Sequence, residues 1–90
     1  MTLKERCIST GILIDSESLK YFTDILKYIT KEEMASILQL DVPTMEILLA
    51  NLGRLTNENM GRLGKYFNCD AVLIGIMVLD ELEDRLAREN

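Results

Sequence analysis

The sequence has no histidine and no tryptophan, a single proline and only two cysteines. The lack of histidine removes the commonest general base and the commonest nitrogen ligand of metal ions. Cys7 and Cys69 lie far apart in the chain, so they form neither a redox motif nor a metal-binding spacing, and we expect reduced thiols. We therefore expect no metal and no cofactor.

Long apolar runs are also missing. The longest run, Ala71–Leu79, is far shorter than the ~20 residues that a helix needs to cross a bilayer. Lys4 and Arg6 precede no long apolar region, so a signal peptide is not predicted. We expect a cytoplasmic protein with no membrane contact.

The chain also lacks the usual elements of an enzyme. It has no phosphate-cradling glycine loop and no nucleophile beside a base at a useful spacing. Paired acids such as Glu32 and Glu33 are typical of solvated helix surfaces. The sequence therefore predicts neither an enzyme nor a small-molecule substrate.

Basic residues are outnumbered by acidic ones, at 10 against 15, which gives a formal net charge of −5. Proteins that bind DNA usually carry a basic face, because neutralising phosphates supplies most of the affinity. The acidic balance disfavours DNA as a partner, although the distribution of charge matters more than its total.

What the chain does contain is a globular composition, with 48% hydrophobic and 28% charged residues. Its 90 residues suffice for one domain. Apolar residues at helical spacing predict an all-α fold, a compact domain of five helices. We divide the domain 1–90 into an N-terminal arm (1–14), a helical core (15–69) and a C-terminal dimerisation helix (70–90).

The arm is rich in β-branched residues on both sides of Gly11. This content favours a short strand or an extended arm that lies on a partner. A loosely ordered tail is the alternative.

A first helix is expected to begin at Asp15 or Ser16, because either residue can serve as its N-cap. Its apolar stripe comprises Leu19, Phe22, Ile25, Leu26 and Ile29. A second helix is expected from Thr30, which forms a capping box with Glu33.

The third helix is expected to begin at Asp41 or Val42, because Pro43 is tolerated only in a first turn. Its inward face is expected to comprise Met45, Leu48, Leu49 and Leu52. The fourth helix carries Gly61 and Gly64, although glycine lowers helix propensity. We expect another backbone to approach closely at these positions; the alternative is that the helix simply tolerates them.

The segment from Thr30 to Asp70 resembles the lambda-repressor/Cro-like (XRE-type) helix-turn-helix family. The second helix of that family typically reads Glu-Glu-Leu-Ala-x-x-Leu, and residues 32–38 here read EEMASIL. Its closing element often reads Leu-x-x-Leu-Ala-Lys-Tyr-Phe-Asn-Val-Ser, and residues 60–70 read MGRLGKYFNCD. The two pieces keep the family spacing without a gap, and the resemblance covers residues 19–74. It implies a helix-turn-helix fold whose third helix, in the family, enters the major groove.

The third helix departs from the family at the positions that would read bases. From Leu40 to Ala50 there is no Arg, Lys, Asn or Gln, the residue types best suited to reading base edges. Asp41 and Glu46 would meet phosphates with like charge. The resemblance places several residues on the outward face of the third helix, and others lie next to that face. The residues expected to face a partner protein or DNA are Lys31, Asp41, Pro43, Thr44, Glu46, Ile47 and Ala50.

These observations favour a transcription-regulatory protein that binds another regulator or partner protein through its third helix, as an antirepressor or co-regulator does. The alternative is a dimeric, sequence-specific DNA-binding repressor or activator. Under that alternative the residues that contact phosphates are Lys31, Arg54, Arg62 and Lys65. The same four cations are otherwise solvated surface charges.

The C-terminal helix has more apolar residues than a domain of this size is expected to bury alone. The residues expected to pair with a second copy are Val72, Ile76, Leu79, Leu82 and Leu86. The sequence therefore predicts a homodimer. The alternative is a helix that folds back fully on its own core.

Overall fold

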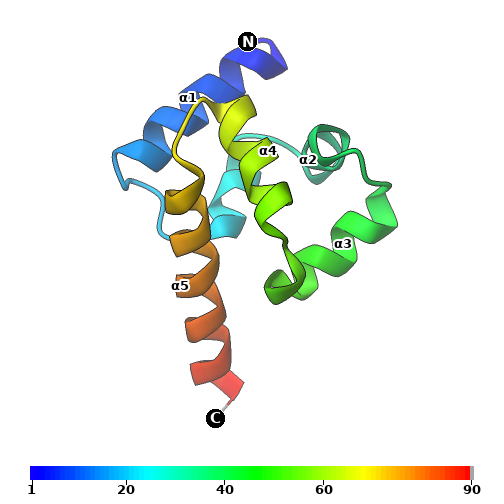
Figure 1. Cartoon of the computed structure of the whole chain (residues 1–90), viewed down its shortest axis with the longest axis vertical. Coiled ribbons are helices and arrows are strands. Elements are labelled where there is room, and N and C mark those ends of the chain that lie inside the picture. The colour runs from blue at the N-terminus through cyan, green and yellow to red at the C-terminus, as the bar shows by residue number, and fades with distance from the viewer. Residues whose placement is uncertain (90) are drawn as a thin grey trace.

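A computed structural model describes residues 1–89 of the chain, and these residues form five α-helices and two short 3₁₀-helices (Figure 1). In chain order the elements are α1 (Leu3–Asp15), η1 (Phe22–Lys27), α2 (Lys31–Leu38), α3 (Val42–Ala50), η2 (Leu52–Arg54), α4 (Asn57–Phe67) and α5 (Ala71–Glu89). No strand occurs in this part of the chain, so the all-α prediction is confirmed. None of these helices is long and apolar enough to cross a membrane.

The expected N-terminal arm is wrong, because residues 3–15 form helix α1. The hydroxyl of Thr2 accepts a hydrogen bond from the backbone N–H of Glu5, and the Glu5 carboxylate accepts one from the Thr2 N–H, which makes a complete capping box. The hydroxyl of Thr10 donates to the carbonyl of Arg6 at 2.7 Å, which lets this β-branched residue sit buried inside the helix. The capping box at Thr2 and Glu5 therefore outweighs the preference of the β-branched residues for a strand.

The first helix expected from Asp15 or Ser16 is also wrong. The chain leaves α1 at Ser16, passes through Glu17 with a left-handed backbone (φ 58°), and forms only the 3₁₀-helix η1. The apolar stripe itself was read correctly as core. Phe22, Ile25 and Ile29 are buried, while Leu19 and Leu26 are half-buried against them.

Helices α2 and α3 begin where their caps predict. Thr30 and Glu33 form the expected capping box, with the Thr30 hydroxyl accepting from Glu33 N–H at 3.1 Å. The side chain of Asp41 accepts from the Thr44 N–H at 2.9 Å at the start of α3. Between them Gln39 takes a left-handed conformation (φ 59°), which ends α2 and turns the chain towards α3.

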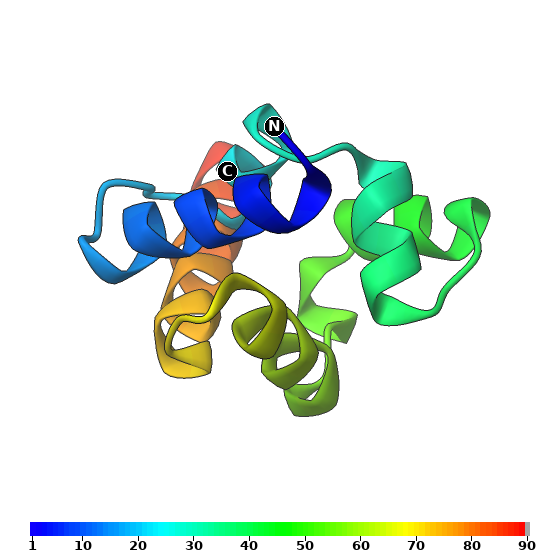
Figure 2. The same cartoon turned by 90° about the horizontal axis from the view of Figure 1, so that it is seen from above.

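All five α-helices and both 3₁₀-helices contribute buried side chains to the core, and α2 and α3 pack together to one side of α4 (Figures 1 and 2). Its largest fully buried side chains include Phe22, Met34, Met45, Leu63 and Phe67. Helix α5 begins beside the carboxyl end of α4 and runs to the opposite end of the view from the N-terminus (Figure 1).

Two glycines mark close contacts between helices. A Cβ added at Gly11 would lie 1.8 Å from the carbonyl oxygen of Phe67, so α1 and α4 touch backbone to backbone there. A Cβ at Gly64 would lie 3.1 Å from the Cys69 carbonyl oxygen and 3.2 Å from Ala71 Cβ. Gly61 meets nothing within 4 Å among the described residues. Of the two glycines expected to mark close approach in α4, only Gly64 does so.

Candidate interaction surface

Helix α3 is fixed to the domain along one side, which leaves its other side facing solvent. Of the four residues expected to face inward, Met45 is fully buried and Leu48 and Leu49 are half-buried against the core, while Leu52 is buried in the following 3₁₀-helix η2. Pro43 lies within the first turn, where its missing N–H costs no helical hydrogen bond. This packing sets the orientation of the exposed side.

The carboxyl end of α3 is held by Arg85 of α5. One guanidinium nitrogen of Arg85 donates to the carbonyl oxygens of Leu49 at 3.0 Å and Ala50 at 3.4 Å. The other nitrogen donates to the buried carboxylate of Glu81 at 2.8 Å. Glu81 also accepts from the N–H and the hydroxyl of Thr23, at 2.9 and 2.8 Å. A charged network therefore ties α3 to both α5 and η1.

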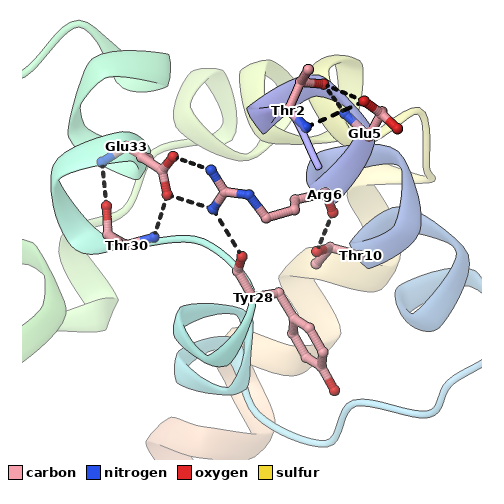
Figure 3. A network of polar contacts seen from close by, with 7 residues as sticks. All are labelled: Thr2, Glu5, Arg6, Thr10, Tyr28, Thr30 and Glu33. Atoms are coloured by element: carbon pink, nitrogen blue, oxygen red, sulfur yellow. Dashed lines mark hydrogen bonds and ion pairs between the residues drawn. The ribbon is translucent and has the colours of Figure 1, made fainter.

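The amino end of α2 is tied to α1 by a second charged network (Figure 3). The guanidinium of Arg6 donates two hydrogen bonds to the Glu33 carboxylate, at 2.8 and 2.6 Å, and a third to the Tyr28 carbonyl at 3.3 Å. These bonds from Arg6, together with that from the Thr30 N–H, lower the pKa of Glu33 to about 2. The same carboxylate thus caps α2 and joins it to α1.

Of the seven residues predicted to face a partner or DNA, six are exposed at α3 and its N-cap, and the seventh, Lys31, is half-buried at the start of α2. We call this surface the α3 face and define it by Asp41, Pro43, Thr44, Glu46, Ile47 and Ala50, all of which are exposed. Ile47 is the large apolar side chain of the face and is 51% exposed. An isoleucine this exposed on a fixed helix offers an apolar contact to a partner.

The charges of the α3 face are few and partly compensated. The ammonium of Lys31, at the start of α2, lies 3.5 Å from the Glu46 carboxylate. The hydroxyl and the backbone N–H of Thr44 hold the pKa of Asp41 below its ordinary range, so this carboxylate stays ionised. Two carboxylates and one ammonium leave the surface weakly negative.

The four cations expected to contact phosphates are not gathered on one surface. Lys31 lies beside the α3 face, while Arg54 lies near Leu82 and Leu86 of α5. Arg62 and Lys65 line a groove between α4, α2 and α1. Lys4 of α1 joins them there, and it was missed because residues 1–14 were not expected to be helical.

Helix α5 presents most of the residues predicted for dimerisation to solvent. Val72, Ile76, Leu79 and Leu86 are exposed by 66%, 46%, 60% and 61%. The fifth residue, Leu82, is half-buried and packs against the core, so it is a poor probe of an interface. We call the four exposed residues the α5 stripe.

The two thiols lie in surroundings that favour their protonated form. Both cysteines are free thiols, and Cys7 is buried. Burial, followed by the nearby carboxylates of Asp15 and Asp70, raises the pKa of Cys69 to about 11, and burial also raises the pKa of Cys7. Within residues 1–89 no group of three or more His, Cys, Asp or Glu side chains is placed to hold a metal ion.

No known protein family, curated protein or solved structure matches this chain.

Proposed function

We propose that this chain is a non-enzymatic regulatory protein of helix-turn-helix fold that binds another protein, preferably another regulator, through the α3 face. The observation that carries the proposal is the chemistry of that face: Ile47 is exposed beside Pro43 and Ala50, with few charges around it, on a helix whose carboxyl end is held by Arg85.

The arrangement of α2 and α3 supports the helix-turn-helix assignment. They are short helices of 8 and 9 residues that pack against each other. The connection between them is short, and its first residue, Gln39, has the left-handed backbone that a tight turn requires. This is the segment in which the sequence resembles the lambda-repressor/Cro-like family.

The same face is poorly suited to DNA. Reading a base edge requires bidentate donors and acceptors, and α3 has no Arg, Lys, Asn or Gln. The one ammonium beside the face, that of Lys31, is outnumbered by the carboxylates of Asp41 and Glu46. A weakly negative surface would also repel the phosphates that supply most of the affinity for DNA.

A protein partner fits these features better. Ile47 would supply the apolar anchor, with Pro43 and Ala50 beside it and the charged residues at the rim. A partner that offers a basic surface would be attracted to Asp41 and Glu46 during the encounter. If that basic surface is the DNA-reading surface of another regulator, binding would block it, as an antirepressor does.

We further propose that the protein acts as a homodimer that pairs through the α5 stripe. The stripe lies on the side of α5 opposite to the buried residues Ile74, Met77, Val78 and Glu81. Its spacing of four and three residues between Val72, Ile76 and Leu79 is that of helices that pair along an apolar seam.

The experiment that tests the main proposal compares the protein with its Ile47→Arg variant. Each is immobilised, partners are captured from a lysate and identified, and the affinity of a purified partner is measured by calorimetry. We expect Ile47→Arg to weaken binding by at least about tenfold, because a charged side chain replaces the apolar anchor. Ile12→Arg, at an exposed isoleucine of α1, is the matched control and should bind normally. Equal affinity for the protein and Ile47→Arg would refute the proposal.

A further inference from the structure

A second surface lies on the other side of α2 from the α3 face. It is an open groove of about 830 Å³ between the first turn of α1, the carboxyl half of α2 and the exposed side of α4. Its lining includes Leu3, which is half-buried, Ile37, which is buried and so forms part of the floor, and Tyr66, which is 55% exposed. The groove therefore offers an apolar floor and an aromatic ring to an occupant.

The edge of the groove is positively charged. Lys4 of α1 and Arg62 and Lys65 of α4 line it, and no acidic residue does so among the residues described. Arg62 contacts Glu58 at 3.2 Å, but Glu58 is 75% exposed, and an exposed pair of this kind holds the arginine only weakly. Three cations thus gather on a protein whose formal net charge is −5.

We propose that this groove binds an acidic, amphipathic peptide segment of a partner protein. Apolar side chains of the segment would pack on Leu3, Ile37 and Tyr66, and its carboxylates would meet Lys4, Arg62 and Lys65. The arrangement of an apolar floor under a charged rim is that of many peptide-binding grooves.

A nucleic acid fits the groove less well, although its phosphates would also meet the three cations. A strand continues beyond the groove, where Glu5 follows Lys4 on α1 and Glu58 precedes Arg62 by one turn on α4. Both acids are exposed and would repel further phosphates. A peptide segment can place its carboxylates at the three cations and carry uncharged residues beyond them, whereas a nucleic acid carries a phosphate at every nucleotide.

The proposal goes beyond the binding function of the α3 face. The two surfaces have opposite charge and lie on different sides of α2, so they suit different partners. A chain that binds one protein at each surface would bring the two proteins together, and loss of either surface would leave the other intact.

The test uses the full chain and a fluorescein-labelled synthetic helical peptide, with leucines at alternating spacings of three and four and glutamates between them. Binding is followed by fluorescence anisotropy, and the residues involved are located by amide chemical shifts. We expect shifts at Lys4, Ile37, Lys65 and Tyr66. The double variant Arg62→Gln/Lys65→Gln should weaken binding by about tenfold.

Controls separate the groove from general electrostatics. The variant Lys20→Gln/Lys27→Gln removes the same charge from two exposed lysines outside the groove and should bind normally. A peptide with serine in place of leucine should bind at least about tenfold more weakly, because it leaves the apolar floor uncovered. An Ile47→Arg variant should bind the peptide normally, which keeps this test independent of the α3 face.

Three results would overturn the proposal. The first is no binding of the acidic peptide by the unmodified protein. The second is equal weakening in the groove variant and in the Lys20→Gln/Lys27→Gln control. The third is tighter binding of single-stranded DNA than of the peptide at the same groove, which would assign the groove to nucleic acid.

Discussion

The contact between α1 and α4 predicts that a side chain at Gly11 destabilises the fold, because the two backbones meet at the place where a Cβ would lie. A Cβ at this position would lie 1.8 Å from the carbonyl oxygen of Phe67 and 2.8 Å from its carbonyl carbon. Both atoms belong to the backbone of α4, so no side-chain rotation relieves the overlap. The substitution Gly11→Ala must therefore push α1 away from α4.

The expected cost follows from two opposing effects. Alanine in a helix is favoured over glycine by about 1 kcal/mol. Forcing an extra carbon into a packed contact costs about 1–3 kcal/mol, and more where backbone must move. Because backbone must move here, we take a cost of about 2–4 kcal/mol, and subtracting the ~1 kcal/mol gained by alanine leaves a net loss of about 1–3 kcal/mol of unfolding free energy. For a domain of this size that lowers Tm by on the order of 5–20 °C.

The assay is thermal unfolding followed by circular dichroism, with Gly61→Ala as the matched control. Gly61 lies in α4 with nothing within 4 Å of an added Cβ among the described residues, so alanine there should raise stability by up to about 1 kcal/mol. Opposite shifts in Tm are expected for the two variants. A Gly11→Ala protein as stable as the unmodified one would refute the backbone contact between α1 and α4.

Two further predictions concern the charged network and the α5 stripe. Because Arg6 and Thr30 lower the pKa of Glu33 from 4.5 to about 2, its carboxylate stabilises the fold above pH 4.5, and that stabilisation is lost as the pH falls from 4.5 towards 2. Glu33→Gln should show a smaller fall of Tm across this window than the unmodified protein, and parallel curves of Tm against pH would contradict the role of the network. For the stripe, Leu79→Asp should convert a dimer to a monomer in sedimentation experiments at unchanged helicity, while Ile12→Asp, at an exposed residue of α1, should leave the dimer intact. A protein that is monomeric before any substitution, or one whose mass Leu79→Asp leaves unchanged, would refute pairing through the stripe.

Local signals in the sequence predicted the middle of the fold well. The capping box at Thr30, the aspartate cap at Asp41 and the proline at position 43 each act within one turn of a helix. Their outcome depends little on the rest of the molecule. The six residues predicted for the α3 face are exposed for the same reason, since the period of the helix and the buried Met45 fix which side is outside.

The prediction failed in the first third of the chain, at residues 3–15 and in the segment that follows them. Residues 3–15 include β-branched residues, which favour strands. The capping box of Thr2 and Glu5 could also be read from the sequence, and it favours the helix that forms. The apolar residues after Asp15 have the spacing of an α-helix. The segment nevertheless forms a short 3₁₀-helix, which packs Phe22 and Ile25 against α5. Here tertiary packing overrides the periodic pattern.

The long-range contacts were beyond any pattern in one sequence. Arg85 holds the end of α3, and Glu81 bonds to Thr23 across 58 residues of chain. The groove is lined by residues of three helices, with Lys4 from α1 and Lys65 from α4. Such pairs are set by how the helices pack, and no spacing along the chain marks them.

The central claim is that α3 is a protein-binding helix and not a reader of DNA. The measurement that tests it most directly is a titration of the purified protein against mixed genomic DNA fragments, repeated from low to physiological ionic strength. We expect no preference for any fragment and no binding at physiological salt, because the α3 face has no Arg, Lys, Asn or Gln to read base edges. Tight binding of one fragment that weakens steeply with salt, and that Ile47→Arg or Thr44→Ala abolishes, would contradict the account.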